Sequence, residues 1–277
     1  MHVIGICRFS YPGFGGFQVE HDSIEERIAF LYDPARLEER FRYFEAFALP
    51  CLRAQTDPDF TFLVVIGDQM PPEWRARLES LVADLPQAVI QAHPPGPHRD
   101  VMKTAINAVK RPGKAPNIQF RLDDDDAVAV SFVARLRRAA EQAAGLLADH
   151  RHIAIDFHGG HIARPGPGGL DTMAIRKPFW TAGLGVLFRP QVGATVMNFA
   201  HQSIGRKMPT LGFADPDMML RGHSDRNDSR QAEGVKTFAL KPQDKEGEAL
   251  FRAAYNIDAD AVRQVFRTPP APVRGRR

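Results

Sequence analysis

Short apolar runs alternate with helical patterns through the first half of the chain. The strand-like runs lie at 3–7, 61–67, 88–92, 117–122 and 152–157. Between them, apolar residues recur at helical spacing, in segments 34–52, 71–85, 100–110 and 128–149. Strands separated by helices of this length form βαβ units. The pattern therefore predicts an α/β fold with a mainly parallel central sheet flanked by helices.

The second half of the chain is less regular. Glycines at 159–160 and the Gly/Pro-rich stretch 165–169 indicate loops, as does segment 10–33 nearer the start. Residues 180–188 read as a loop that runs into a strand, and 192–204 predicts a helix. The segment 207–230 is polar and rich in possible ligand residues.

These patterns suggest a single domain over 1–265. We expect a nucleotide-binding half at 1–127 and an acceptor-side half at 128–265. The remaining residues, 266–277, are rich in proline and arginine, and we expect a disordered basic tail.

Composition narrows the class of protein. The chain has 277 residues, of which 44% are hydrophobic and 25% charged, as in ordinary soluble domains. A net charge of +3 suits an anionic ligand or a membrane surface. No basic block with interleaved aromatics is present, so we expect no nucleic acid partner. The sequence shows neither a signal peptide nor an apolar run of membrane-spanning length. We therefore expect a cytoplasmic location, with peripheral contact at the inner membrane surface left open.

Four consecutive aspartates, Asp123 to Asp126, follow the predicted strand at 117–122. Such carboxylates repel one another unless a cation lies among them. Alternate residues of an extended segment share a face, so Asp123 and Asp125 could hold Mg²⁺ or Mn²⁺. Asp126 could replace either of them. Asp124 and Asp126 are otherwise candidates for substrate binding or for shaping the turn. A solvated acidic turn is the alternative interpretation.

Other polar residues follow the predicted strands. Ligands of parallel sheets bind beyond the carboxyl ends of the strands. Arg8 and Ser10 follow the first strand and could hold a base, ribose or phosphate of a nucleotide. Asp68 ends the second strand and could bind a base or ribose, and Lys103 could reach a phosphate. The alternatives are structural turns for the first three residues and a solvated helix face for Lys103.

Two late segments add candidate chemistry. His223 lies in a polar cluster with Asn227, so it could complete a metal shell or contact a diphosphate. Asp215 and Asp217 flank Pro216, and either could be the general base that deprotonates an acceptor hydroxyl. Asp215 could instead cap a helix that begins at Pro216.

The motifs together resemble a known family. The run Leu-Asp-Asp-Asp-Asp after a strand is similar to the DXD region of GT-A glycosyltransferases. More narrowly, the chain resembles a bacterial rhamnosyltransferase family. The segments that carry this resemblance are 8–11, 62–68, 102–107, 121–127, 183–185 and 223–229.

The resemblance implies a GT-A fold, a nucleotide-diphosphate sugar donor and a divalent cation. It also implies that Asp123 and Asp125 belong to the DXD element and that His223 joins the metal site. The chain departs from the pattern at the base, where Asp-Pro-Asp replaces a Glu-Asp pair.

The leading hypothesis is a metal-dependent glycosyltransferase. It would move a sugar, rhamnose by the family name, from a nucleotide-diphosphate donor to a hydroxyl of a glycan or lipid-linked acceptor. A sugar nucleotidyltransferase and a non-enzymatic module that binds a divalent cation are the two alternatives.

Overall fold

The computed structural model describes residues 1–15, 21–223 and 238–268. Its centre is a seven-stranded sheet in the order β10-β6-β9-β4-β1-β2-β3. The strands are β1 (His2–Arg8), β2 (Phe60–Gly67), β3 (Ala88–His93), β4 (Asn117–Arg121), β6 (His152–Phe157), β9 (Leu184–Phe188) and β10 (Thr210–Phe213). Strand β9 runs antiparallel to both of its neighbours, and the other pairs are parallel. The predicted mainly parallel α/β sheet is confirmed.

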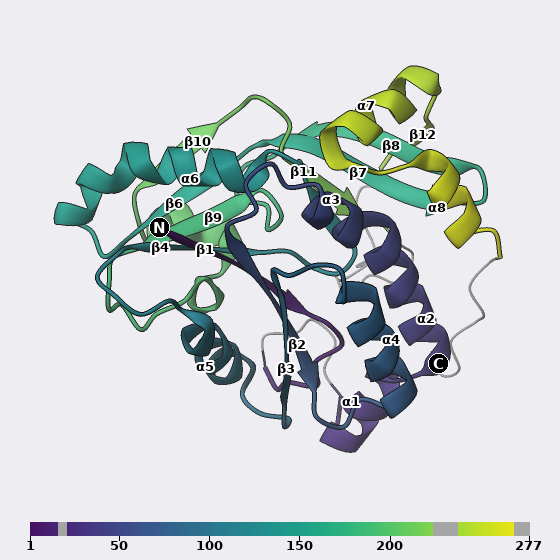
Figure 1. Ribbon diagram of the computed structural model, residues 1–277, viewed down its shortest axis with the longest axis horizontal. Coiled ribbons are helices and arrows are strands. Elements are labelled where there is room, and N and C mark those ends of the chain that lie inside the picture. Colours follow the sequence, from purple (N-terminus) through teal and green to yellow (C-terminus); the bar gives the residue numbers. More distant parts are fainter. Residues whose placement is uncertain (16–20, 224–237, 269–277) are drawn as a thin grey trace.

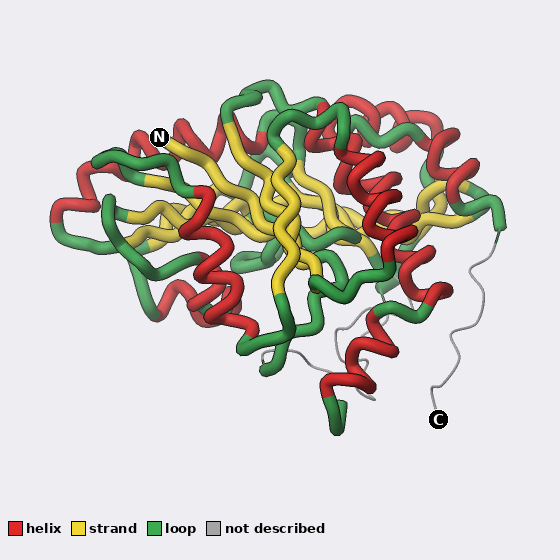
Figure 2. Tube along the Cα trace, turned by 60° about the horizontal axis from the view of Figure 1, so that its bottom comes forward, coloured by secondary structure: helices red, strands yellow, loops and turns green. Residues whose placement is uncertain are grey.

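Helices cover both faces of this sheet, as Figure 2 shows. The α-helices of the described residues are α1 (Ile24–Leu31), α2 (Pro34–Tyr43), α3 (Leu49–Arg53), α4 (Pro72–Val82), α5 (His98–Val109) and α6 (Phe132–Ala143), with α7 (Lys245–Tyr255) and α8 (Ala259–Val265) near the C-terminus. Residues of α2, α4 and α6 share one apolar core, and residues of α5 and segment 196–206 share the other. Successive strand residues such as Phe62 and Leu63 enter opposite cores, as the two-residue period of a strand requires.

A second, five-stranded sheet lies beside the first, in the order β12-β8-β7-β11-β5. Its strands are β5 (Asp126–Val128), β7 (Gly159–Gly166), β8 (Gly169–Arg176), β11 (Met219–Gly222) and β12 (Lys241–Pro242). Figure 1 shows α7 and α8 beside β7 and β8.

The loop predicted at 159–160 is wrong, because these residues begin strand β7. The stretch 165–169 contains a turn at 167–168, which joins β7 and β8 into a hairpin. A Cβ on Gly160 would lie 2.1 Å from the backbone oxygen of Met219. The glycine therefore permits the close approach of β7 and β11.

Three further segments differ from the prediction. Part of the loop predicted at 10–33 is helix α1. The helix predicted from 128 begins at Phe132, since Val128 belongs to β5 and residues 129–131 form the connection between the two. The helix predicted at 192–204 is two short 3₁₀ turns, Val196–Asn198 and His201–Arg206. The Asn198 side chain accepts a hydrogen bond from the Thr195 backbone N–H, and this local bond favours a capped turn over a continuous helix.

The C-terminal part of the described chain packs on the domain. Phe266, the first residue of the predicted tail, is buried and its ring contacts Tyr43 edge to face. Residues 269–277 of that tail lie outside the described residues. In the described ranges, no helix has the length and apolar character needed to cross a bilayer.

Gln55 links helix α3, helix α6 and the connection between β5 and α6. Its buried amide donates to the carbonyls of Cys51 and Ala129 and accepts from the N–H of Val133. Gln55→Leu should lower the free energy of unfolding by about 2–4 kcal/mol, because it leaves buried backbone groups unpaired. Denaturant unfolding measures this. The same change at exposed Gln264 on α8 is the control, and equal stability of the two variants would contradict the expectation.

Candidate active site

The aspartates form a tight turn between β4 and β5. Oxygens of Asp123, Asp125 and Asp126 all lie within 4.8 Å of one another. Asp126 is buried, and Asp125 is only 9% exposed. The predicted pair Asp123 and Asp125 is therefore brought together, and Asp126 joins it. Three carboxylates this close repel one another unless positive charge is present.

Arg40, near the end of α2, holds the turn from the side. Its Nε donates to Asp124 at 2.7 Å, its Nη2 also contacts Asp124, and its Nη1 donates to Asp125 at 3.2 Å. The bidentate pair engages the buried carboxylate of Asp124, so this residue shapes the turn. Burial lowers the pKa of Arg40, but Asp124 and Asp125 outweigh it and hold that pKa well above its ordinary value.

Strand β11 closes the other side of the turn. Arg221 lies opposite Asp126 in the antiparallel register, and the Gly222 N–H donates to Asp126 at 3.1 Å. A Cβ on Gly222 would lie 1.9 Å from the Asp125 backbone oxygen, so only glycine fits here. Burial, followed by repulsion from Asp125, raises the pKa of Asp126 well above its usual range. A nearby cation would relieve that cost.

His223 follows β11 directly. Its N–H donates to the Ala163 carbonyl at 2.8 Å, and its own carbonyl accepts from the Tyr43 hydroxyl at 3.1 Å. Its ring contacts Phe238 edge to face. Among the described residues, the His223 imidazole does not belong to the cluster formed by Asp123, Asp125 and Asp126. The structure thus brings the His223 backbone to the acidic turn, and Asn227 lies outside the described residues.

Basic side chains surround the exposed side of the turn. Arg8 lies 3.5 Å from Asp123 and 3.1 Å from Nε2 of buried His98. Arginine only donates, so this Nε2 accepts and His98 is neutral. Arg121 ends β4 and donates to the Phe199 carbonyl at 2.7 Å. Burial, together with Arg8, lowers the pKa of Arg121 to about 10.

The remaining predicted nucleotide contacts are more dispersed. Ser10 is buried, has a φ of 51°, and its hydroxyl accepts from Arg36 at 3.0 Å. Asp68 is exposed just after β2. Both therefore lie beyond carboxyl ends of neighbouring strands, as expected. Lys103 is exposed on α5, in the turn after His98.

The two predicted bases lie in the connection from β10 to β11. Asp215 is exposed and paired with Arg176 at 2.6 Å. Asp217 is partly exposed, and its carboxylate lies 3.8 Å from Nε2 of His161. No helix begins at Pro216 in this described segment, so the alternative of a helix cap at Asp215 is wrong. The chain turns there through a cis Asp215–Pro216 bond and enters β11 as a strand.

Sequence reasoning missed Arg40 and His98 as parts of this site. Arg40 lies 84 residues before Asp124, so no local spacing joins them. The one available signal was the pair Arg36 and Arg40, which fall on one side of a helix with buried leucine and phenylalanine.

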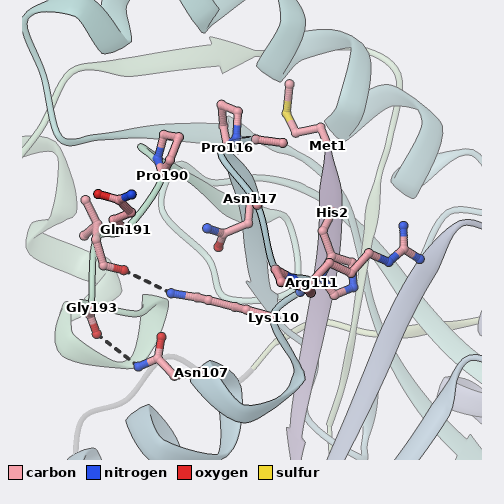
Figure 3. A pocket seen from close by; sticks show the side chains of 14 residues that line it. Met1, His2, Asn107, Lys110, Arg111, Pro116, Asn117, Pro190, Gln191 and Gly193 are labelled. Atoms are coloured by element: carbon pink, nitrogen blue, oxygen red, sulfur yellow. Dashed lines mark hydrogen bonds between the residues drawn. The ribbon is translucent and has the colours of Figure 1, made fainter.

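A pocket of about 340 Å³ lies at the opposite end of the sheet (Figure 3). It lies between the starts of β1 and β4 and the segment 190–193. Lys110 donates across it to the Val192 carbonyl, and Asn107 donates to the Gly193 carbonyl. The acidic turn lies at the carboxyl ends of the strands instead. We base the candidate site on that turn because its groups converge and its charges need a partner.

Comparison with known proteins bears on this geometry. Residues 2–236 match the model of the family described as "Putative rhamnosyl transferase". The chain belongs to this family. Its membership confirms the expected resemblance to a rhamnosyltransferase family. The comparison with curated proteins finds no match.

Solved structures give distant likenesses. S. aureus TarS 1–349 has a TM-score of 0.41 and 10% identity over 80% of this chain and 60% of its own. Its complex with UDP-GlcNAc has a TM-score of 0.41 and 11% identity over 81% of this chain and 59% of its own. A "putative nucleotide-diphospho-sugar transferase" from Desulfovibrio desulfuricans G20 has a TM-score of 0.36 and 12% identity over 95% of this chain and 97% of its own. The chain thus spans about 60% of the TarS structure, and similarity this low carries no argument about function.

His98 gives a pH test of the site. Burial, reinforced by Arg8, lowers the pKa of His98 to about 3. The unfolded chain binds a proton near pH 6.5, whereas the folded chain does not until about pH 3. Stability is therefore lost as the pH falls through this window, by up to about 1.4 kcal/mol per pH unit. In denaturant unfolding, the free energy of unfolding of His98→Gln should fall less between pH 6.5 and pH 5 than that of the wild type. The control is the exposed His150→Gln, which should keep the pH dependence of the wild type. If His98→Gln kept the wild-type pH dependence of the free energy of unfolding, or if His150→Gln reduced it equally, the assignment would be contradicted.

Proposed function

We propose that this protein is a metal-dependent glycosyltransferase that moves a sugar from a nucleotide-diphosphate donor to an acceptor hydroxyl. The observation that carries the proposal is the convergence of Asp123, Asp125 and Asp126 at the carboxyl edge of a parallel sheet. The family membership gives the reaction class, and its name gives rhamnose as the donor sugar to test first. A glycan or lipid-linked acceptor and peripheral membrane contact remain predictions from the sequence.

The acidic turn fits a hard divalent cation. Its oxygens are the ligands that Mg²⁺ and Mn²⁺ take, and substrate phosphates commonly complete the shell. Burial, followed by repulsion from Asp125, raises the pKa of Asp126. This shift supports the proposal, because a cation bound at the turn would stabilise the ionised carboxylate. Asp123, Asp125 and Asp126 would hold the cation. When bound, it would stabilise the negative charge that develops on the diphosphate as the sugar leaves.

Basic residues beside the turn suit the donor phosphates. Arg8 adjoins Asp123, and Arg121 ends the strand that leads to it. The guanidinium of Arg121 lies near Arg8 and Arg99 as well as Asp123, and one backbone carbonyl is its hydrogen-bond partner among the described residues. A phosphate would supply the acceptors that the described residues do not. Ser10, Asp68 and Lys103 remain candidates for the nucleoside and phosphates. His223 and Asn227 remain candidates for the metal and donor.

The acceptor's proton needs a base. Of the two carboxylates predicted from sequence, the geometry favours Asp217, because Asp215 is exposed and paired with Arg176. A histidine at the end of β6, His158, is a further candidate among the described residues.

Asp125→Asn tests the donor site. Wild-type protein should bind one nucleoside diphosphate among UDP, GDP and dTDP in calorimetry, and only when Mn²⁺ is present. Asp125→Asn should weaken that binding by about 100-fold, because it removes charge from the cation's ligand set. The fold should survive, since Asp124 keeps its pair with Arg40.

Exposed Asp149→Asn is the matched control and should bind as the wild type does. Equal nucleotide affinity with and without Mn²⁺ would contradict the proposal. Cation binding that ignores nucleotide would indicate the non-enzymatic module. Pyrophosphate release from a nucleoside triphosphate and a sugar 1-phosphate would indicate a nucleotidyltransferase.

A further inference from the structure

A histidine–carboxylate pair lies at the carboxyl end of β6, outside the acidic turn. The Asp156 side chain is fully buried, whereas that of His158 is 31% exposed. Nε2 of His158 lies 3.1 Å from Oδ2 of Asp156. A buried carboxylate that holds a partly exposed imidazole is an arrangement suited to acid–base chemistry.

Neighbouring segments fix both members of the pair. Oδ2 of Asp156 also accepts from the Phe179 N–H at 2.8 Å. Oδ1 of Asp156 has no hydrogen-bond partner among the described residues. Gly212 of β10 lies opposite Asp156 in register, and a Cβ there would lie 2.9 Å from Cε1 and Nε2 of the His158 ring. The ring therefore packs against a glycine that leaves it just enough space.

The contacts determine the tautomer of His158. An ionised carboxylate only accepts, so Nε2 carries the proton and donates it to Asp156. Nδ1 then carries the lone pair. No described residue forms a hydrogen bond with Nδ1, and the side chain reaches solvent. Nδ1 of His158 is thus the nitrogen that can accept a proton.

The pair lies at the same edge of the sheet as the acidic turn. Strands β6 and β4 are separated by β9 alone, which places their ends about 10 Å apart at ordinary strand spacing. Segment 179–180 connects the two regions. Nδ1 of His201 lies 2.5 Å from the Phe179 carbonyl, and the Arg221 guanidinium lies 5.2 Å from the centre of the Trp180 ring.

Arg221 in turn lies opposite Asp126. The pair is therefore linked to the acidic turn through Trp180 and Arg221.

We propose that His158 is the general base that takes the proton from the acceptor hydroxyl, with Asp156 as its positioning residue. This proposal rests on the proposed glycosyltransferase function. The acceptor oxygen forms its bond to the anomeric carbon, and the bond from that carbon to the diphosphate oxygen breaks with its electron pair. The acceptor proton passes to Nδ1 of His158. The imidazolium so formed is stabilised by the Asp156 carboxylate.

The two carboxylates compare less well. Free imidazole is more basic than a carboxylate by about two pKa units, so it accepts a hydroxyl proton more readily at neutral pH. Asp215 is engaged by Arg176. Asp217 is held near His161, whose Nδ1 lies 3.1 Å from the Tyr255 hydroxyl. The carboxylate of Asp217 thus lies beside a histidine whose ring is already packed and hydrogen-bonded.

Several charged groups lie on the segments packed near His158. Its own strand contributes Asp156, and β10 contributes Gly212 and Phe213, which carry no charge. Lys177 donates its backbone N–H to the His158 carbonyl, but its ammonium lies 4.5 Å from the centre of the Trp180 ring. The pair of Asp215 and Arg176 follows nearby and is internally neutral. Asp217 is a further carboxylate beside this segment, since a Cβ on Gly159, the residue after His158, would lie 2.5 Å from its Oδ1. The pH profiles of His158→Gln and Asp217→Asn therefore have to be compared.

The test compares His158→Gln with Asp217→Asn, Asp215→Asn and the exposed control His150→Gln. Release of nucleoside diphosphate from UDP-, GDP- and dTDP-linked rhamnose is measured in single turnovers with methyl hexosides as acceptors. Calorimetry with Mn²⁺ and the nucleoside diphosphate tests the donor site separately. His158→Gln should slow transfer by about 10²–10⁴-fold, with unchanged nucleotide affinity and loss of the acidic limb of the pH profile.

Asp156→Asn should slow transfer less and shift that limb, and melting temperatures check that each variant is folded. Transfer at wild-type rate in His158→Gln would overturn the proposal, as would a loss confined to Asp217→Asn. A wild-type protein that binds no nucleotide with Mn²⁺ would overturn the proposed function itself. Intact metal-dependent binding with unaltered transfer in His158→Gln would overturn only the assignment of the base.

Discussion

The ion pair between Arg40 and Asp124 is the constraint on which the site depends. Four adjacent carboxylates cannot pack into one turn without positive charge. Arg40 binds Asp124 through two nitrogens and reaches Asp125 with a third. Breaking a buried pair of this kind costs about 3–5 kcal/mol. With Asp124 neutralised, the other three carboxylates face one another, and the charge that remains is available for a ligand.

The two sheets meet at this turn, and that junction explains the local sequence. Asp126 begins β5 in the small sheet, just after β4 of the central sheet ends. Strand β11 approaches so closely that Gly222 has no room for a Cβ against Asp125. The acidic turn is thus clamped by a helix on one side and a strand on the other. Such a clamp fixes the carboxylates before any cation binds, which reduces the entropy lost on binding.

The sequence predicted the features whose signals are local. Apolar periodicity located the parallel strands, and the alternation of side chains paired Asp123 with Asp125. Arg8 was expected near the turn because neighbouring strands end together, and it lies 3.5 Å from Asp123. The sequence left Asp126 either as a metal ligand or as a residue that binds substrate or shapes the turn. A turn does not keep the alternation of side chains that a strand has.

The features that escaped prediction depend on contacts between distant segments. Arg40 reaches the turn across 84 residues, and His98 reaches Arg8 across 90. The glycines at 159–160 read as a loop because the partner strand that requires them, β11, lies about 60 residues later. The proposed base His158 needs β10 and Phe179 to set its environment, and neither follows from local spacing.

The most direct test of the account is a titration of the protein with Mn²⁺, followed by the electron paramagnetic resonance signal of the unbound ion. The account predicts one bound Mn²⁺ per chain, tighter binding when a nucleoside diphosphate is added, and loss of the site in Asp126→Asn. Arg40→Ala should also weaken it, because the turn would no longer hold its carboxylates together. Absence of stoichiometric binding by the wild type, or wild-type binding in Asp126→Asn, would contradict the central claim.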